Sequence, residues 1–474
     1  MKVSKNSFYS FLFFCSLGIL CNTIGKILSP TFYGIQTASV IQLLVFLAGF
    51  FILGKKNKNF LSPYNIFLTA FYLFQNGQVL LYSLGVEYDY FYVERYEKIV
   101  LLNSIIFSTN CLCAALTAGS VVNPKKEFTN RFYTKLNGIN RNYVLSLGRI
   151  LWWIFAIAAV PYMFLKLFIT ATSGYFAMME FVSRLPSVVN LLEKMFLGIS
   201  ILLLIYSDRK SLIHKFLTIV LVLWSVMAAL AGDRTVGLAG LITIALIRFT
   251  IGDKARKKIP ITKYFLLAIV GIIVMYLVSI AFSFRMQTDI STGGLQSTII
   301  DVIGTLGFSF FPLVLIMRLY PSQMPFVYGK SFVGGFVSGL LPSTFDFLNI
   351  TKIFTEWNSE GTKLLDSYYN YGFGLDFSLN AECYMNFGNF GWIAMFLICC
   401  LIASLLRQVD YTRKDNLFSQ YSVIVLLYSW LTLPRRKSYY LFNNFFWYVF
   451  AIGLILLIFT NIQNKKINRK MKGI

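Results

Sequence analysis

The densest group of chemically capable side chains lies between Tyr371 and Gly391, a stretch that reads YGFGLDFSLNAECYMNFGNFG and leads into an apolar run. Glycines in such a stretch let the backbone approach a ligand closely. Residues 378–386 are predicted to form a short helix. Because residues four positions apart lie on one helix face, this helix presents Glu382 and Asn386 together.

Two carboxylates in this stretch are candidate bases. Glu382, or failing it Asp376, could take up a proton from a hydroxyl group if it lies in a partly desolvated cleft. The alternative for Glu382 is structural, since a carboxylate in the first turn stabilises a helix N-terminus. The sequence leaves both interpretations open.

The elements that position these residues are predicted to be transmembrane helices. Of the 474 residues, 57% are hydrophobic and 13% are charged, and the mean hydropathy is +0.66. A soluble domain carries about a quarter charged residues, and a helix needs roughly 20 mainly apolar residues to cross the hydrocarbon core. The composition therefore excludes a water-soluble protein. It predicts an all-α, polytopic transmembrane helical bundle, a single integral membrane domain over residues 1–474.

Twelve apolar runs are long enough to be predicted spans. They cover residues 8–28, 36–54, 62–84, 98–121, 144–167, 188–206, 216–231, 235–250, 263–284, 387–406, 417–434 and 443–461. The first run follows a basic end and shows no convincing cleavage site, so we predict a retained span.

A long polar segment, residues 285–386, interrupts this pattern. It is rich in Gly, Pro, Ser, Asn and aromatic residues and is much longer than an ordinary connection. We predict one large extracytoplasmic loop that contains short helices. Two apolar runs in it, Thr298–Leu319 and Ser331–Leu341, are either further spans or half-embedded helices, which gives twelve spans or fourteen. Asp301 would then lie at membrane depth, where it either has a function or caps a re-entrant helix.

The basic residues set the orientation. The net charge is +23, and Lys and Arg concentrate in alternate short connections between the apolar runs. By the positive-inside rule this pattern places both termini in the cytoplasm and the acidic, aromatic connection 85–97 outside. The same distribution argues against nucleic-acid binding, which requires a basic patch on a folded surface.

Six arginines are exceptions, because they are predicted on the outer side: Arg95, Arg184, Arg234, Arg285, Arg435 and Arg436. Of these, Arg234, Arg285, Arg435 and Arg436 lie at the ends of spans and are the candidate diphosphate ligands. A guanidinium group binds two phosphate oxygens at once, and its charge stabilises a diphosphate as a bond to that diphosphate breaks. The alternative role is anchoring among lipid head groups. For Arg435 and Arg436 anchoring is at least as well supported.

Other reactive side chains give weaker evidence of a functional site. The single histidine, His214, lies in a basic connection that we predict to be cytoplasmic, and we interpret it as a surface residue rather than a base. The seven cysteines show neither disulfide nor zinc-ligand spacing. Glu87 and Asp89 form a possible metal pair, which we interpret as solvated acids. We therefore expect no metal and no other cofactor.

The stretch from Gly372 to Gly391 resembles the O-antigen and capsular polysaccharide polymerases, the Wzy-type oligosaccharide repeat unit polymerases. A second match is PFVYGKS at residues 325–331, followed by Leu340-Leu341-Pro342. The order of spans and the large loop agree with that family over nearly the whole chain. The family often has an arginine after the proline that corresponds to Pro342, but Ser343 stands here, so no role is assigned to this part of the loop.

The resemblance implies a reaction. A growing glycan on undecaprenyl diphosphate is transferred to a new lipid-linked repeat unit on the outer face of the bacterial cytoplasmic (inner) membrane, and undecaprenyl diphosphate leaves. The arginines would bind the diphosphate, Glu382 or Asp376 would activate the acceptor hydroxyl, and Tyr371, Tyr384 and Asn386 would line a sugar cleft. Its partners would be these lipid-linked oligosaccharides, membrane lipids, and a flippase and chain-length regulator.

Two alternatives remain. An O-antigen ligase would have the same architecture and donor but a different acceptor. Such ligases typically use a histidine in the large loop, and the large loop of this chain contains no histidine. A lipid-linked oligosaccharide flippase should show two similar halves and charges inside the bundle. The single large loop favours a polymerase over both.

Overall fold

The computed structural model describes residues 5–57, 60, 62–86, 97–122, 131–185, 187–232, 234–250, 295–340, 350–368, 377–406 and 416–471. Every regular element in these residues is a helix, and no strand occurs among them. The prediction of an all-α polytopic membrane protein is confirmed.

Within the described residues, ten helices are long and apolar enough to cross a membrane. Nine coincide with predicted spans, and the tenth, Ile299–Leu319, is the first optional run of the large loop. Three predicted spans are not among these ten helices. Residues 62–84 and 235–250 form helices that are shorter or more polar than the ten, and residues 263–284 lie outside the described residues. The second optional run forms a helix of 11 residues, which is too short to cross the hydrocarbon core.

The chain folds into two compact units. Unit 1 comprises residues 1–124, 292–407 and 430–442, and unit 2 comprises residues 125–291, 408–429 and 443–474. Helices α17 (Leu417–Leu431) and α18 (Tyr439–Asn444) contribute residues to both units.

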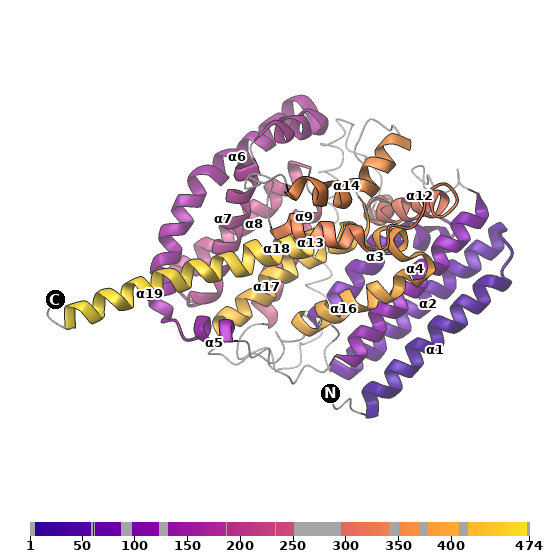
Figure 1. Ribbon diagram of the computed structural model, residues 1–474, viewed down its shortest axis with the longest axis horizontal. Coiled ribbons are helices and arrows are strands. Elements are labelled where there is room, and N and C mark those ends of the chain that lie inside the picture. The colour runs from indigo at the N-terminus through magenta and orange to yellow at the C-terminus, as the bar shows by residue number, and fades with distance from the viewer. Residues whose placement is uncertain are drawn as a thin grey trace. The chain divides into compact units, whose positions relative to one another are not determined.

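Unit 1 is built around α4. Its helices are α1 (Lys5–Ile27), α2 (Phe32–Asn57), α3 (Pro63–Ser83), α4 (Lys98–Val121), α11 (Leu295–Gly307), α12 (Phe311–Leu319), α13 (Lys330–Leu340), α14 (Ile350–Tyr368), α15 (Leu379–Phe387) and α16 (Gly391–Leu406). Figure 1 shows α1, α2 and α4 side by side, and α16 also packs against α4. Small residues allow this close approach: a Cβ atom at Gly49 of α2 would lie 2.4 Å from Leu116 Cδ2 of α4.

Two helices of the predicted loop, α13 and α14, pack tightly at Gly334 of α13. A Cβ atom there would lie 2.6 Å from the carbonyl oxygen of Phe354 and 2.8 Å from the backbone nitrogen of Asn358. Both neighbours are backbone atoms of α14, so they cannot move aside unless the helix shifts. The glycine therefore sets the spacing of this helix pair.

We expect Gly334→Ala to lower the midpoint temperature of thermal unfolding of the purified protein, because overpacking costs about 1–3 kcal/mol. Gly138→Ala is a matched control, since a Cβ atom at Gly138 would meet nothing closer than 3.5 Å. Equal midpoints for the two variants would contradict the close packing of α13 and α14.

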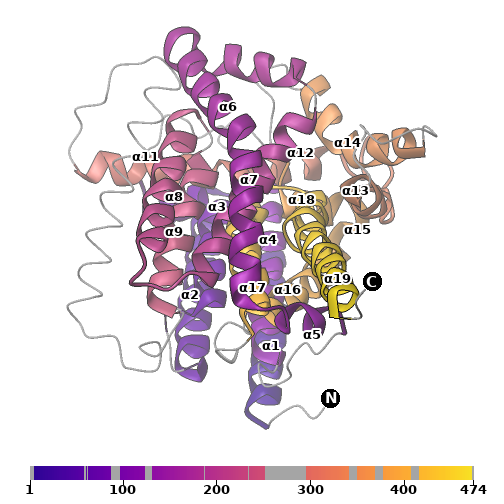
Figure 2. The same ribbon diagram turned by 90° about the vertical axis from the view of Figure 1, so that its left-hand side faces the viewer.

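Unit 2 is a second helical bundle. It contains α5 (Arg131–Asn137), α6 (Arg141–Arg184), α7 (Ser187–Tyr206), α8 (Leu212–Leu230), α9 (Arg234–Thr250), the π-helix η7 (Phe445–Ala451) and α19 (Ile452–Met471). Helix α6 packs against α7, and α8 packs against α9 (Figure 2). The path of α6 breaks at Gly174, where φ is 82° and ψ is 173°, so its first segment ends there.

Candidate active site

The short helix predicted in the stretch from Tyr371 to Gly391 is α15. The hydroxyl group of Ser378 accepts a hydrogen bond from the backbone nitrogen of Ala381 (3.3 Å) and caps the helix N-terminus. The helix ends at Gly388, whose φ of 56° disfavours a side chain. Cap and glycine thus fix both ends of α15.

Glu382 of α15 is fully buried in unit 1 and accepts three hydrogen bonds. Its Oε1 accepts from the hydroxyl groups of Ser331 (3.0 Å) and Ser438 (2.9 Å). Its Oε2 accepts from the backbone nitrogen of Ser438 (2.6 Å). One carboxylate therefore joins α15 to the start of α13 and to the segment that precedes α18.

Asn386 completes this arrangement from the same face of α15. Its Nδ2 donates to Ser331 Oγ (2.6 Å) and to the carbonyl oxygen of Glu382 (2.7 Å), and its Oδ1 accepts from the backbone nitrogen of Gly329 (2.8 Å). The prediction that Glu382 and Asn386 share one helix face is confirmed. Both side chains also bind the same serine.

Three consecutive cations, Arg435, Arg436 and Lys437, directly precede the serine that Glu382 binds; we call them the cationic turn. All three are half-buried. The turn is held on its other side by Gln75 of α3, whose side-chain amide donates to the carbonyl oxygen of Pro434. The backbone of the cationic turn is therefore fixed at both ends.

Side-chain contacts also fix the cationic turn. Lys437 Nζ donates to the carbonyl oxygen of Asn358 (2.6 Å) and to Thr362 Oγ1 (2.9 Å), both in α14. The guanidinium group of Arg436 lies 4.6 Å from the ring centroid of Tyr440. Lys437 also interacts electrostatically with Glu382, and a buried carboxylate needs such compensation.

A second hydrogen-bond chain fixes α15 from another side. Asn380 Nδ2 donates to Ser108 Oγ of α4 (3.1 Å), which donates to Asn76 Oδ1 of α3 (2.6 Å). All three residues are buried. Helix α15 is thus tied to α3 and α4 as well as to α13.

Tyr384, a predicted sugar-binding residue, has a different environment. Its ring makes edge contacts with Phe107, at a centroid distance of 5.1 Å, and with Phe326, at 5.9 Å. The side chain is 6% exposed. Its aromatic ring packs in the core beside the polar network of Glu382.

The remaining predicted site residues lie largely outside the described residues. This applies to the side chain of Arg234, whose backbone begins α9, and to all of Arg285, Tyr371 and Asp376. Their roles stay predictions.

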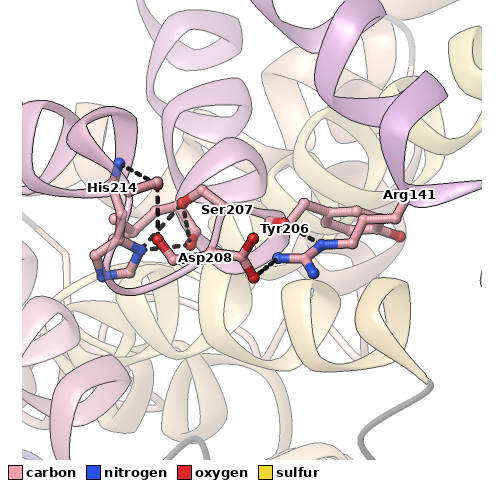
Figure 3. Close-up of polar contacts among 7 residues, drawn as sticks. Arg141, Tyr206, Ser207, Asp208 and His214 are labelled. Atoms are coloured by element: carbon pink, nitrogen blue, oxygen red, sulfur yellow. Dashed lines mark hydrogen bonds and ion pairs between the residues drawn. The ribbon is translucent and has the colours of Figure 1, made fainter.

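His214 lies in unit 2, at the start of α8 (Figure 3). Its Nδ1 is 3.0 Å from Ser207 Oγ, just after α7, and 3.2 Å from the carbonyl oxygen of Leu204 in the last turn of α7. Nearby, Arg141 and Asp208 form an exposed ion pair of 2.7 Å. These contacts fasten the turn between α7 and α8, which agrees with a structural role for the histidine.

Sequence reasoning missed the partners that shape this site. Ser331, Ser438, Lys437 and Gln75 were not among the predicted site residues, although Ser331 belongs to the PFVYGKS motif and Lys437 follows the two arginines directly. The motif around Ser331 and the two arginines before Lys437 were the features of the sequence that could have identified these two residues. Among the described residues, no three His, Cys, Asp or Glu side chains are grouped so that they could hold a metal ion.

The described residues thus form a multi-pass helical membrane protein. Its polar site, a buried carboxylate beside a fixed cationic turn, lies between helices. The family model of the O-antigen polysaccharide polymerase Wzy matches residues 7–467. The chain therefore belongs to the Wzy family of O-antigen polysaccharide polymerases, and the predicted resemblance is confirmed. Comparison with curated proteins and with solved structures gave no match.

Proposed function

We propose that this polymerase joins undecaprenyl-diphosphate-linked oligosaccharide repeat units into a surface polysaccharide by glycosyl transfer on the outer face of the cytoplasmic membrane. The growing glycan is the donor, and the terminal sugar of a new lipid-linked unit is the acceptor. The bond between the donor sugar and the diphosphate breaks, a bond to the acceptor oxygen forms, and the acceptor proton passes to a base. Both termini lie in the cytoplasm.

The observation that carries this proposal is the fixed cationic turn. As the glycosyl bond breaks, negative charge grows on the leaving diphosphate, and Arg435 and Arg436 can each offer it paired hydrogen bonds. Charges that are already in place stabilise a transition state without reorganisation. Glu382 and Gln75 supply that preorganisation through Ser438 and Pro434. Arg234 and Arg285 are proposed as further diphosphate ligands.

For Glu382 the geometry favours a positioning role. Both carboxylate oxygens accept hydrogen bonds from Ser331 and Ser438, and the side chain is 0% exposed. We therefore propose that Glu382 holds the cationic turn and that Asp376 takes the acceptor proton. Tyr371 stays the proposed sugar contact. Tyr384 packs against Phe107 and Phe326 and supports the site from the core, while Asn386 supports Glu382.

Reconstitution of the purified full-length protein in liposomes tests this function. The substrate is the pool of single lipid-linked repeat units extracted from cells that lack the polymerase. We expect a ladder of products spaced by one repeat unit, and one undecaprenyl diphosphate released for each bond formed. Added chelator should leave the rate unchanged, because the cationic turn supplies the positive charge at the leaving group.

Other outcomes identify the alternatives. Transfer of the glycan only to a different acceptor would indicate a ligase, and movement of the lipid-linked unit across the bilayer without elongation would indicate a flippase. Loss of activity with chelator, restored by a divalent cation, would contradict metal independence. A chain-length regulator, if it is a partner, should change the ladder's length distribution and leave its spacing unchanged.

A further inference from the structure

Unit 2 contains an ion pair inside two apolar helices that the proposed reaction does not use. Lys166 Nζ of α6 lies 2.6 Å from Glu193 Oε2 of α7, and the two side chains are 16% and 20% exposed. Both residues belong to candidate membrane spans. Ionisable groups at membrane depth are costly and usually mark a functional path.

Further polar groups surround this ion pair. Tyr162 donates from its hydroxyl group to Asn190 Oδ1 (2.7 Å), and Lys166 Nζ lies 4.2 Å from the centroid of the Tyr162 ring. The next residue on α7, Lys194, lies on a different face of that helix and donates to Asn443 Oδ1. We call these six residues the unit 2 polar cluster: Tyr162, Lys166, Asn190, Glu193, Lys194 and Asn443.

A second observation marks this place. Asn443 lies shortly before the π-helix η7, which runs over seven residues from Phe445 to Ala451. π-Helical turns are rare and occur frequently at functional sites. Gly198 of α7 packs beside it, since an added Cβ atom would lie 3.0 Å from Tyr448 Cδ1.

We infer that the unit 2 polar cluster binds hydroxyl groups of a sugar in the lipid-linked repeat unit; this inference rests on the proposed function. The cluster combines one carboxylate, two ammonium groups, two amides and a phenol, which together donate and accept hydrogen bonds as sugar hydroxyls require.

The depth of the cluster also suits such a ligand. Glu193 lies about 9 Å along α7 from its start, at 1.5 Å per residue. In the orientation predicted by the positive-inside rule, the start of α7 is the outer end. The cluster then lies in the outer half of the membrane, on the side where the proposed reaction takes place.

Binding to the reconstituted full-length protein tests this site with two probes. One is the extracted single lipid-linked repeat unit, and the other is undecaprenyl diphosphate, which carries no sugar. We expect Glu193→Gln and Asn190→Ala to weaken binding of the first probe about ten- to hundredfold, the loss typical of hydrogen bonds with a charged partner. Binding of the second probe should be unchanged.

Glu180→Gln is the matched control, because Glu180 forms an exposed ion pair with Arg184 and is 64% exposed. It should bind both probes like the wild-type protein. Unchanged binding of the repeat unit by Glu193→Gln would overturn the site. If the wild-type protein binds undecaprenyl diphosphate but gains nothing from the attached sugars, the site is wrong and the proposed diphosphate chemistry stands.

A charge swap separates sugar binding from simple fastening of α6 to α7. The double variant K166E/E193K restores an ion pair with exchanged positions, so a purely structural pair predicts recovery of both thermal stability and repeat-unit binding. We expect stability to recover and repeat-unit binding to stay weak. Recovery of binding would overturn the proposal. Failure of the wild-type protein to bind either probe would instead overturn the proposed function.

Discussion

Replacing Glu382 by alanine is expected to abolish long polysaccharide chains. Glu382→Gln is expected to keep them, with a yield reduced by about tenfold or less. A loss of that size is the cost of one hydrogen bond that is weakened because the acceptor loses its charge. The measurement is the length distribution of lipid-linked glycans in cells that express each variant. The amount of inserted protein is measured beside it, so that loss of protein is not read as loss of activity.

The reason lies in the donors that Glu382 satisfies. Alanine leaves the backbone N–H of Ser438 and the hydroxyl groups of Ser331 and Ser438 without their acceptor in a buried site, at about 1–3 kcal/mol for each unsatisfied group. The cationic turn then loses its fixed position. Glutamine can still accept from the Ser438 N–H, and its amide can donate to the serine oxygens.

The same pair of variants tests the role of base. If Glu382→Gln removes long chains as completely as Glu382→Ala and both proteins insert normally, the negative charge itself is required and Glu382 becomes the candidate base. Glu180→Ala is the control, because that carboxylate is exposed and outside unit 1. It should leave the glycan profile unchanged.

Local features of this site could be predicted from the sequence. A spacing of four residues on a short helix brings Glu382 and Asn386 together, and a serine before the helix followed by a glycine after it sets its ends. Apolar runs of sufficient length predicted nine of the candidate spans. These inferences depend on interactions within a few turns of the chain.

The long-range contacts could not be predicted in this way. Ser331 and Ser438 meet Glu382 from positions 51 and 56 residues away along the chain. Hydropathy indicates that a helix is apolar, but it does not indicate which neighbour each face meets. The role of Gln75 in α3 could not be predicted for the same reason. In the sequence it is one polar residue in an apolar run, whereas in the structure it fixes the cationic turn through Pro434.

Removing the arginines of the cationic turn is expected to give a large loss of rate. Arg435→Ala combined with Arg436→Ala should lower the initial rate of chain extension in liposomes by about a hundredfold or more, since one preorganised donor contributes about 10²–10³ to a rate. The corresponding lysine variants should recover part of that loss, because lysine keeps the charge but cannot form paired hydrogen bonds. Lys437→Ala should lose less, since Lys437 Nζ is engaged with α14.

Two comparisons decide whether this loss arises at the leaving diphosphate. Lys210→Ala removes an exposed cation from a turn of unit 2 and should leave the rate unchanged. Binding of undecaprenyl diphosphate should weaken in the double arginine variant while the thermal midpoint stays near that of the wild-type protein. If the rate falls but binding of undecaprenyl diphosphate does not, the two arginines act mainly on the transition state, where the charge on the leaving group is greatest. If neither changes, they anchor the protein among lipid head groups, and Arg234 and Arg285 become the proposed diphosphate ligands to test next.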